Sequence, residues 1–399
     1  MKITSLETIR PDFQSNLCVL VLTTDDGIQG LGEAFFHTAT VETYLHESVA
    51  PVLFSIPDPN PERVASTLAP YVGFQGGGAE NRGNGAVDIA LWDIAGKRAG
   101  LPVVDLLGGS TRDSIPTYNT CAGTGYVGDT SRQESANWGL ERAGKYEDLR
   151  SFLTRPGALA KELLYEGLTG MKIWPFDELA EQTLGTNMSR SALAPGIAIV
   201  SDIRDSVGEQ MDLMIELHGL WNRPGAEVLI NELTPFRPYW VEDPIRSDAV
   251  DALIQLRAHT DVRIATGETA VGRRGFLPLL QGGAVDIATV DVQWTGGLTE
   301  ARKIASLADT FGVALAPHDC TGPITLAACT HLVMSQPNGL IQETTRAFLH
   351  TWYNDVAEGL PALHDGELRL STDPGLGVRL VPGLRGRDGV RSRLSTPAM

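Results

Sequence analysis

One chemically reactive side chain closes each of a series of short apolar runs in the middle of the chain. The residues in this position are Lys172, Glu216, Glu242, Glu268, Asp291, His318 and Glu343. From Glu216 onward they recur at intervals of 23 to 27 residues. A strand of about five residues and a crossover of a dozen or more take roughly this length. Isolated polar residues often follow strands because loops are wet, but a steady series of them indicates the active-site rim of a (β/α)8 barrel.

The first three acidic residues of this series have the composition of a metal site. Glu216, Glu242 and Glu268 close consecutive runs at an equal spacing of 26 residues, so their carboxylates should converge. Three carboxylates without a cysteine are hard oxygen ligands, which favour Mg²⁺ over Zn²⁺. The alternative is a set of salt-bridged glutamates, but few basic residues close the neighbouring runs. The sequence therefore predicts one Mg²⁺ per subunit on these three residues.

Two histidines have positions suited to proton transfer. Asp291 and His318 close neighbouring runs, and a carboxylate that holds the far nitrogen of an imidazole raises its basicity, as a general base requires. His218 lies two residues beyond Glu216 and points to the same side if the strand persists, as a metal ligand or as a general acid. Glu343, if buried near a metal, could be protonated and donate a hydrogen bond.

Three further side chains are candidates for substrate binding. Lys172 is a cation that faces the same centre and could bind a substrate carboxylate. Trp174 lies two residues on and shares that side of the strand, where it would form an apolar wall. Packing in the barrel core is an equally good interpretation of Trp174. His37 and residues 11–16 belong to predicted loops of the N-terminal part, where substrate selectivity should reside.

The length of 399 residues allows a barrel of about 250 residues and a smaller unit. Residues 1–112 have the pattern of an α+β unit, with strands at 2–10, 17–24 and 28–34 and helices at 38–50, 61–71 and 83–99. Residues 113–358 are expected to form the barrel, with its first strand at 115–121. Residues 359–399 form an irregular tail rich in glycine and proline.

Two polar insertions interrupt the rhythm of the barrel. Residues 123–155 are too many for a simple βα loop, and we expect a lid or a subunit contact there. Residues 175–195 form the second insertion, and a crossover helix at 198–207 should follow it. A last helix is expected from Glu343 to about Val356.

Composition excludes several classes of function. The formal net charge of −17 argues against nucleic acid as a partner, because phosphates are bound by basic surfaces. No run approaches the roughly 18 apolar residues of a membrane span, and the N-terminus carries no secretory signal. The four cysteines, Cys18, Cys121, Cys320 and Cys329, form no CxxC pair, so we expect reduced thiols in a cytoplasmic protein.

Three segments of the chain resemble a known family. They are Glu80-Asn81-Arg82 with the helix and Leu107-Gly108-Gly109 that follow, Trp240-Val241-Glu242-Asp243-Pro244, and Thr266-Gly267-Glu268. Over nearly its full length the chain resembles the enolase superfamily, in its mandelate racemase-like branch. The resemblance implies a capping domain, residues 1–112, completed by the tail. A histidine or lysine base with Mg²⁺ beside the enediolate is the established pattern of this superfamily.

The resemblance also implies roles for the site residues. It implies Mg²⁺ on Glu216, Glu242 and Glu268, a base dyad of His318 and Asp291, and Glu343 hydrogen-bonded to the enolate oxygen. The pattern Glu216-Leu217-His218 is similar to acid-sugar dehydratases of the D-galactonate dehydratase type, in which the histidine is the acid. Racemases of this branch carry Lys-x-Lys on the second strand, whereas this chain has Lys172-Ile173-Trp174.

These expectations predict a lyase that dehydrates a sugar-derived, aldonate-like acid to a 2-keto-3-deoxy acid through an enolate. The substrate would be a small carboxylate, and we expect a homo-oligomer. An alternative is a racemase, epimerase or cycloisomerase that uses the same enolate on a hydroxy acid or lactone. A barrel kept as a binding protein would lack at least one ligand or base, and none is missing from the sequence.

Overall fold

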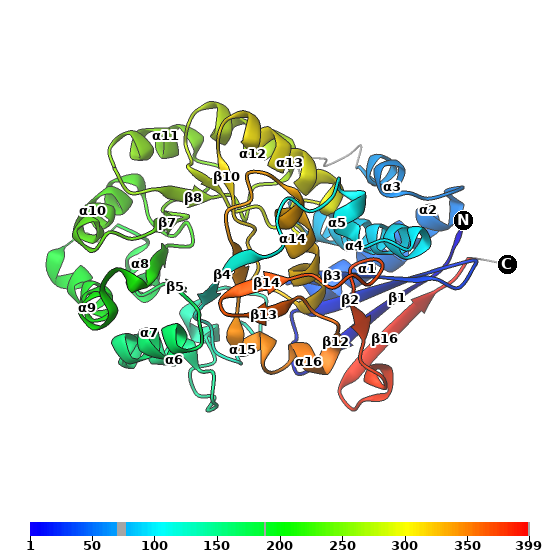
Figure 1. Cartoon of the computed structure of the whole chain (residues 1–399), viewed down its shortest axis with the longest axis horizontal. Coiled ribbons are helices and arrows are strands. Elements are labelled where there is room, and N and C mark those ends of the chain that lie inside the picture. Colours follow the sequence, from blue (N-terminus) through cyan, green and yellow to red (C-terminus); the bar gives the residue numbers. More distant parts are fainter. Residues whose placement is uncertain (70–76, 187–188, 398–399) are drawn as a thin grey trace.

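The computed structural model of the chain describes residues 1–69, 77–186 and 189–397. Figure 1 shows two parts side by side: an arc of helices around a central set of strands, and a unit in which a long antiparallel sheet packs against helix α4. Both termini lie in the second unit. No helix in the described ranges combines the length and apolar character that crossing a membrane requires.

Eight parallel strands of the described chain form the barrel. They are β4 (Ile115–Thr120), β5 (Gly170–Ile173), β6 (Asp212–Glu216), β7 (Trp240–Glu242), β8 (Ile264–Thr266), β9 (Ile287–Ala288), β10 (Ala314–Leu315) and β11 (Gln342–Thr344). Each strand from β4 to β9 pairs in parallel with the next. β11 pairs with β4, and a bridge between Leu315 and Gly339 completes the ring. The expected (β/α)8 barrel is therefore confirmed.

Helices follow the strands and cover the outside of the barrel. They are α6 (Asp148–Thr154), α7 (Pro156–Tyr165), α8 (Asp177–Thr183), α9 (Arg190–Val207), α10 (Arg223–Leu233), α11 (Val250–Ala258), α12 (Gly272–Gln281), α13 (Leu298–Thr310), α14 (Pro323–Ser335), α15 (Arg346–Leu349) and α16 (Tyr353–Val356). Every residue of α14 is buried, because this helix lies between the barrel and the N-terminal unit. It therefore lacks the polar face of the other barrel helices.

The N-terminal unit is an antiparallel sheet in the order β16-β1-β2-β3, formed by β1 (Ile3–Pro11), β2 (Leu17–Thr24), β3 (Gln29–Phe35) and β16 (Val390–Ser395). Its helices are α1 (Thr38–Tyr44), α2 (Ala50–Ser55), α3 (Pro61–Leu68), α4 (Ala79–Ala99) and α5 (Val103–Leu106). Helix α4 lies directly on β3, where a Cβ at Gly32 would approach the Ala86 carbonyl oxygen to 1.9 Å. Only glycine permits this contact.

The C-terminal tail joins the two parts. β16 adds a strand to the N-terminal sheet by pairing with β1, so the tail contributes to the unit that was predicted as a capping domain. β13 (Ala362–His364) and β14 (Glu367–Arg369) form a hairpin that pairs with the start of β4, so the tail also extends the barrel sheet. β12 (Ala357–Glu358) pairs with β15 (Arg379–Leu380) between these contacts. The tail is thus more regular than its content of glycine and proline predicted.

Several predicted helices differ from the observed ones at their ends. The helix expected at 38–50 is divided by a π-helical turn, Leu45–Val49, and α2 then extends to Ser55. The helix expected at 61–71 ends at Leu68, and residues 70–71 lie outside the described ranges. α9 begins eight residues before the predicted start at 198 and contains Pro195 in its second turn. The helix expected up to Val356 is broken between α15 and α16.

Carboxylates of the N-terminal unit cap two barrel helices. Glu33 on β3 accepts hydrogen bonds from the Ile324 and Thr325 amides at the start of α14, at 3.0 and 3.4 Å. Asp88 on α4 accepts from the Thr299 amide at the start of α13, at 2.9 Å. Helix N-termini have free N–H groups and a positive dipole end, so the two parts are joined by favourable electrostatics. Burial nevertheless raises the pKa of both carboxyls to about 7.

His331 of α14 also joins the two parts, and its burial predicts a pH effect. Its Nδ1 accepts a hydrogen bond from the Val104 amide at 3.0 Å, and burial lowers its pKa to about 4. The folded state keeps the ring of His331 neutral, whereas the unfolded chain binds a proton to this ring below about pH 6.5. The free energy of unfolding therefore falls as the pH is lowered below about 6.5. When the pH is lowered from about 7.5 to about 5, the free energy of unfolding should fall by about 2 kcal/mol more in the wild type than in His331→Asn. Urea unfolding would measure this, and parallel pH profiles would contradict it.

Candidate active site

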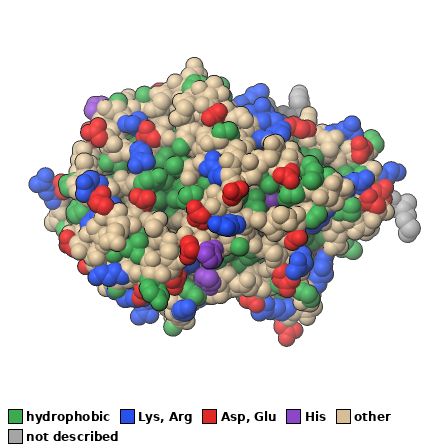
Figure 2. Space-filling model, in the orientation of Figure 1, with side chains coloured by type: hydrophobic (Ala, Val, Ile, Leu, Met, Phe, Trp, Pro, Cys, Tyr) green, Lys and Arg blue, Asp and Glu red, His purple; other side chains and the backbone are tan. Residues whose placement is uncertain are grey.

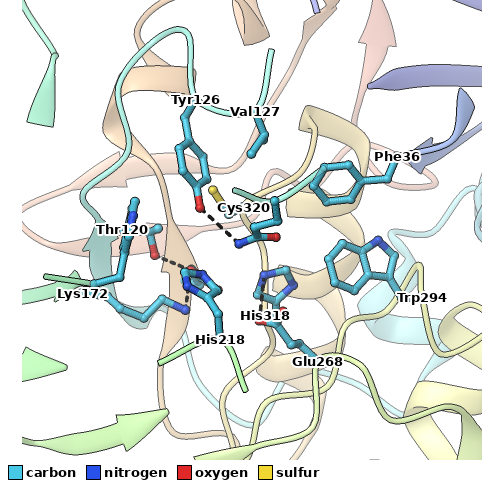
Figure 3. A pocket seen from close by; sticks show the side chains of 13 residues that line it. Phe36, Thr120, Tyr126, Val127, Lys172, His218, Glu268, Trp294, His318 and Cys320 are labelled. Carbon is cyan, nitrogen blue, oxygen red and sulfur yellow. Dashed lines mark hydrogen bonds and ion pairs between the residues drawn. The ribbon is translucent and has the colours of Figure 1, made fainter. Parts of the chain in front are cut away.

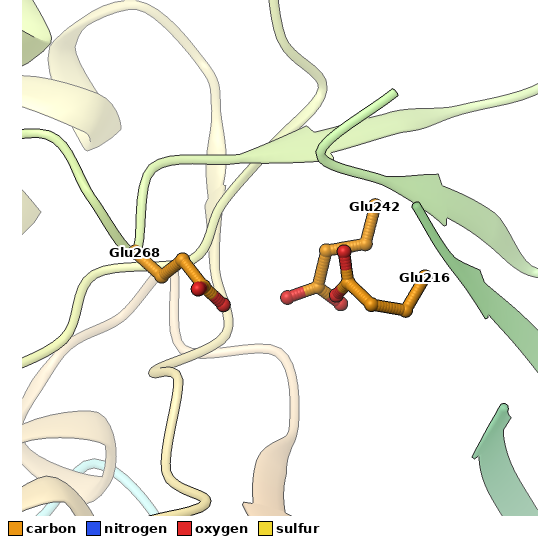
Figure 4. Close-up of side chains that lie close together, drawn as sticks. All are labelled: Glu216, Glu242 and Glu268. Atoms are coloured by element: carbon orange, nitrogen blue, oxygen red, sulfur yellow. The ribbon is translucent and has the colours of Figure 1, made fainter. Parts of the chain in front are cut away.

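Three glutamates converge at the carboxyl ends of neighbouring strands. Glu216 ends β6 and lies in register with Glu242, which ends β7. Glu268 comes two residues after β8. One carboxylate oxygen of each residue lies within 4.8 Å of the others, and all three side chains are buried (Figure 4). The sequence prediction that these carboxylates meet is confirmed as geometry.

The charge of this cluster fits a divalent cation. The trio and Glu343 place four buried carboxylates in one site, and three of them contact one lysine, whose Nζ lies 3.0 Å from Glu343, 3.1 Å from Glu242 and 3.4 Å from Glu216. Lys172 faces this centre as the sequence predicted, and it is the basic residue that pairs with two members of the trio, Glu216 and Glu242. One ammonium cannot balance four carboxylates in a buried site. Oε2 of Glu216 and Oε1 of Glu242 face Lys172 but accept no hydrogen bond within the described part of the chain, so a hard cation could take these oxygens as ligands.

Neighbouring donors orient the glutamates. The amides of Leu217 and His218 donate to Oε1 of Glu216 at 3.0 and 2.7 Å. The indole of Trp240 donates to Oε2 of Glu242 at 2.9 Å, and the other oxygen, Oε1, faces Lys172 Nζ at 3.1 Å. Sequence reasoning missed Trp240, although it lies two residues before Glu242 on one strand and so shares its side.

His318 and Asp291 form the predicted dyad. Nδ1 of His318 lies 2.8 Å from Asp291, whose other oxygen accepts the Trp294 amide at 2.6 Å. The remaining nitrogen, Nε2, faces Glu268 at 3.3 Å. Burial disfavours the imidazolium, but Glu268, Glu343 and Asp291 together raise the pKa of His318 well above its usual value. The imidazole is thus held by one nitrogen and presents the other to the centre of the site.

A second dyad, which the sequence did not reveal, holds His218. Its Nδ1 lies 2.7 Å from Asp177, a buried residue at the start of α8 in the second insertion. Burial opposes the charged ring, yet Asp177 and Glu216 raise the pKa of His218 to about 10. The strand does not persist beyond Glu216 as expected; His218 has φ 48° and reaches the site through a left-handed turn. No spacing rule links residues 177 and 218.

Glu343 is a carboxylate in this arrangement. Burial opposes its ionisation, but Lys172 at 3.0 Å, His318, the Thr120 hydroxyl and the Asp319 amide lower its pKa to about 2. The prediction of a protonated Glu343 was made for a site that holds a metal, and for that site it stays a prediction. Glu343 can accept hydrogen bonds at the site but has no proton of its own to donate.

The catalytic groups line a small enclosed cavity of about 20 Å³ (Figure 3). His218 and His318 lie side by side in it, with Lys172 on one flank and Trp294 on the other. Trp174 is 1% exposed and lines the cavity, and its indole N–H has no hydrogen-bond partner among the described residues. Both interpretations of Trp174 are therefore partly correct: the ring packs on Tyr126 and Phe152, and one edge faces the site.

The first insertion, residues 123–155, covers the cavity. Tyr126 and Gln133 line it and are hydrogen-bonded to each other at 3.1 Å. The N-terminal unit ties down the same segment, because Asn16 donates to the Val127 and Thr130 carbonyl oxygens at 2.6 Å. The predicted loop at 11–16 and the insertion at 123–155 thus form one cover over the barrel mouth.

A second, larger chamber of about 540 Å³ adjoins the cavity. The two share Phe36, Gln133, His218, Glu268 and Trp294 as walls. His37, predicted to bind substrate, lines this outer chamber and not the inner cavity, and its amide donates to the Ser131 hydroxyl at 2.9 Å. On the face in Figure 2, acidic and basic side chains are interspersed over the surface.

Comparisons with known proteins agree with this geometry. Residues 4–108 match the mandelate racemase/muconate lactonizing enzyme N-terminal domain, and residues 157–383 match the enolase C-terminal domain-like family. D-galactonate dehydratase from Ralstonia pickettii is 32% identical over 96% of this chain and 93% of its own length. The enzyme of the same name from Pectobacterium atrosepticum is 31% identical over 95% of this chain and 92% of its own length.

Solved structures show the same fold. An enolase of the mandelate racemase subgroup from Agrobacterium tumefaciens is 40% identical, with a TM-score of 0.88 and 99% of each chain covered. An enolase from the Sargasso Sea environmental genome is 38% identical, with a TM-score of 0.88 over both full lengths. Together with the domain matches, these likenesses show that the chain belongs to the mandelate racemase/muconate lactonizing enzyme family of the enolase superfamily.

Proposed function

We propose that this protein dehydrates a sugar-derived acid to a 2-keto-3-deoxy acid, with one Mg²⁺ per subunit on Glu216, Glu242 and Glu268. The observation that carries the proposal is the pair of imidazole–carboxylate dyads beside the glutamate trio. Elimination of water requires one base to take a proton and one acid to protonate the departing hydroxyl. The dyads His318–Asp291 and His218–Asp177 provide both.

The relatives support this reaction. Those named D-galactonate dehydratase span nearly the whole chain, and the protein is accordingly an enzyme of the lyase class. A sequence identity of about one third supports the same type of reaction but does not identify which acid sugar is the substrate. The small inner cavity and the larger chamber beside it suit a reacting carboxylate end with a polar chain extending outward.

Proton removal begins with the substrate carboxylate in the inner cavity. Lys172 Nζ is the ammonium positioned to attract that carboxylate. A bound divalent cation would supply Lewis-acid stabilisation of the negative charge that develops on the carboxylate oxygens. His318 Nε2 takes the proton from the carbon next to the carboxylate, while Asp291 fixes the ring through Nδ1. The product of this step is an enediolate.

His318 must be neutral before it can accept a proton. Carboxylates around it, Glu268 foremost, raise its pKa in the protein without a cation. A cation bound to the carboxylate of Glu268 would lower the pKa of His318 and so favour the neutral ring. The base is thus coupled electrostatically to the metal site, and loss of the cation should disable both.

Elimination then uses the second dyad. The imidazolium of His218, held by Asp177, gives its proton to the hydroxyl on the adjacent carbon, and the C–O bond breaks to release water. The electron pair of the enediolate forms the new double bond. The resulting enol becomes the 2-keto-3-deoxy acid by tautomerisation, so the overall change is the loss of one water.

The residue on the β5 side of the cavity argues against racemisation. A racemase needs a proton-exchanging group on each face of the planar enolate. Trp174 occupies the position of the second lysine in Lys-x-Lys, and its indole is a donor that does not exchange its proton near neutral pH. A screen of acid sugars with Mg²⁺ for keto-acid product tests the proposal, and epimer formation without keto acid would replace it with the racemase alternative.

We also propose a homo-oligomeric, cytoplasmic enzyme. All four cysteines are free, as in a reducing compartment. Tyr165 at the end of α7 and Leu184 after α8 expose 92% and 83% of their surface, and a second subunit would cover such apolar area.

Removing one predicted ligand should weaken metal binding. Glu242→Gln should lower Mg²⁺ affinity by about 10²-fold or more and abolish turnover, since loss of even an outer partner costs 10–100-fold. Calorimetric titration with Mg²⁺ is the direct measurement. Glu209→Gln is the matched control, because Glu209 is exposed and lies just before β6, at the opposite end of the strand. Unchanged Mg²⁺ affinity in Glu242→Gln would show that the trio is not the metal site.

The two histidines should separate exchange from elimination. In D₂O, His318→Asn should lose exchange of the α-proton, whereas His218→Asn should retain exchange and form about 10²–10⁴-fold less keto acid. Proton NMR follows both processes in one sample. The roles would be reversed if His218→Asn abolished exchange and His318→Asn did not.

Asp177 should act through His218. Asp177→Asn is expected to lower keto-acid formation by about 10²-fold while α-proton exchange persists, because the imidazole loses the partner that fixes its tautomer. Glu178→Gln is the control, since that neighbouring side chain of α8 is exposed. Equal losses of exchange and elimination in Asp177→Asn would indicate a structural role for the carboxylate.

A further inference from the structure

Arg82 is a partly buried cation with no carboxylate in ion-pair contact among the described residues. It lies near the start of α4, and its Nη1 donates to the Phe35 carbonyl oxygen at 3.0 Å. Its guanidinium carbon stands 4.2 Å from the centroid of the Trp294 ring. None of the described carboxylates comes within 4.0 Å of it, and Nε is buried without a hydrogen-bond partner.

A buried arginine of the same chain, Arg346, has carboxylate partners for its guanidinium. Arg346 has Asp148 at 2.7 Å and Glu166 at 2.8 Å, so its charge is balanced inside the protein. Burying a cation without such partners costs free energy, and the face of an aromatic ring offsets only part of that cost. Burial lowers the pKa of Arg82 to about 10, although the charges of Asp291 and Glu268 oppose this effect, so the guanidinium is still charged at neutral pH.

The position of Arg82 connects it with the substrate. It lines the outer chamber of about 540 Å³, which shares its inner wall with the catalytic cavity. A second arginine of this chamber, Arg246, is exposed and already paired with Asp248 at 2.6 Å. Arg82 is therefore the arginine of the chamber that has no carboxylate within ion-pair distance among the described residues, although Asp291 and Glu268 act on it from farther away.

We propose that Arg82 forms a subsite for a second anionic group at the far end of the substrate, so that the preferred substrates are sugar diacids and not sugar monoacids. This rests on the proposed function, which places one carboxylate beside Lys172 in the inner cavity. The chain of the substrate would then run outward past Trp294 to the guanidinium. A terminal hydroxyl could accept a hydrogen bond from Arg82, but only a carboxylate also balances its charge.

Two acids that differ only at the far end test the subsite. D-galactonate ends in a hydroxyl at carbon 6, and galactarate carries a carboxylate there with the same configuration between. Calorimetric binding to the Mg²⁺-loaded protein should show galactarate bound about 10-fold tighter or more, the value of one hydrogen bond between charged groups. In Arg82→Gln this ratio should fall to about one, and Arg82→Lys should retain part of it.

The control isolates the role of Arg82 from overall charge and from folding. Arg98→Gln makes the same charge change in the last turn of the same helix, where Arg98 pairs with Asp26 on the surface, and should keep the wild-type ratio. Equal affinities in wild type, or a ratio that survives in Arg82→Gln, would overturn the subsite. So would an equal loss for both acids, which would mean that Arg82 only supports Trp294. If galactarate binds in this way but neither acid yields keto acid, the proposed dehydration fails while the subsite stands.

Discussion

Four carboxylates buried around one ammonium at the mouth of the barrel determine much of the surrounding structure. The carboxyl ends of parallel strands meet at one rim, so Glu216 and Glu242 at strand ends converge with Glu268, which lies two residues beyond β8. Lys172 balances only part of their charge. The excess raises the pKa of both histidines, and it is what a divalent cation would neutralise. Metal binding and the protonation of His318 are therefore coupled, because the same carboxylates attract the cation and raise the pKa of the imidazole.

The second requirement is a cover that excludes water from this charge cluster. It is assembled from parts distant in sequence: the cap loop with Asn16, the insertion with Tyr126 and Gln133, and α8 with Asp177. Hydrogen bonds from Asn16 to the insertion and helix capping by Glu33 and Asp88 hold these parts on the barrel. Because electrostatic interactions strengthen away from water, the same contacts that dock the cap also strengthen the interactions of the catalytic groups.

The two dyads show what could be predicted from sequence and what could not. Strand periodicity places Asp291 beside His318, because each lies three residues beyond the end of one of two neighbouring strands, β9 and β10. Asp177 lies on a helix of an irregular insertion, and its approach to His218 depends on a left-handed residue after β6 that no alternation rule anticipates. The charge state of Glu343 was also beyond sequence reasoning, because it depends on the reach of the Lys172 side chain. Barrel strands were predictable from their apolar runs, whereas helix ends near Pro195 and within residues 38–50 depend on local backbone adjustments.

Proton NMR of the wild-type protein with Mg²⁺ and an acid sugar in D₂O tests the central claim most directly. A base dyad facing an acid dyad predicts a 2-keto-3-deoxy acid that carries deuterium at carbon 3, with no accumulation of the epimer at carbon 2. Interconversion of the two epimers at carbon 2, with solvent deuterium incorporated there and no keto acid formed, would contradict it.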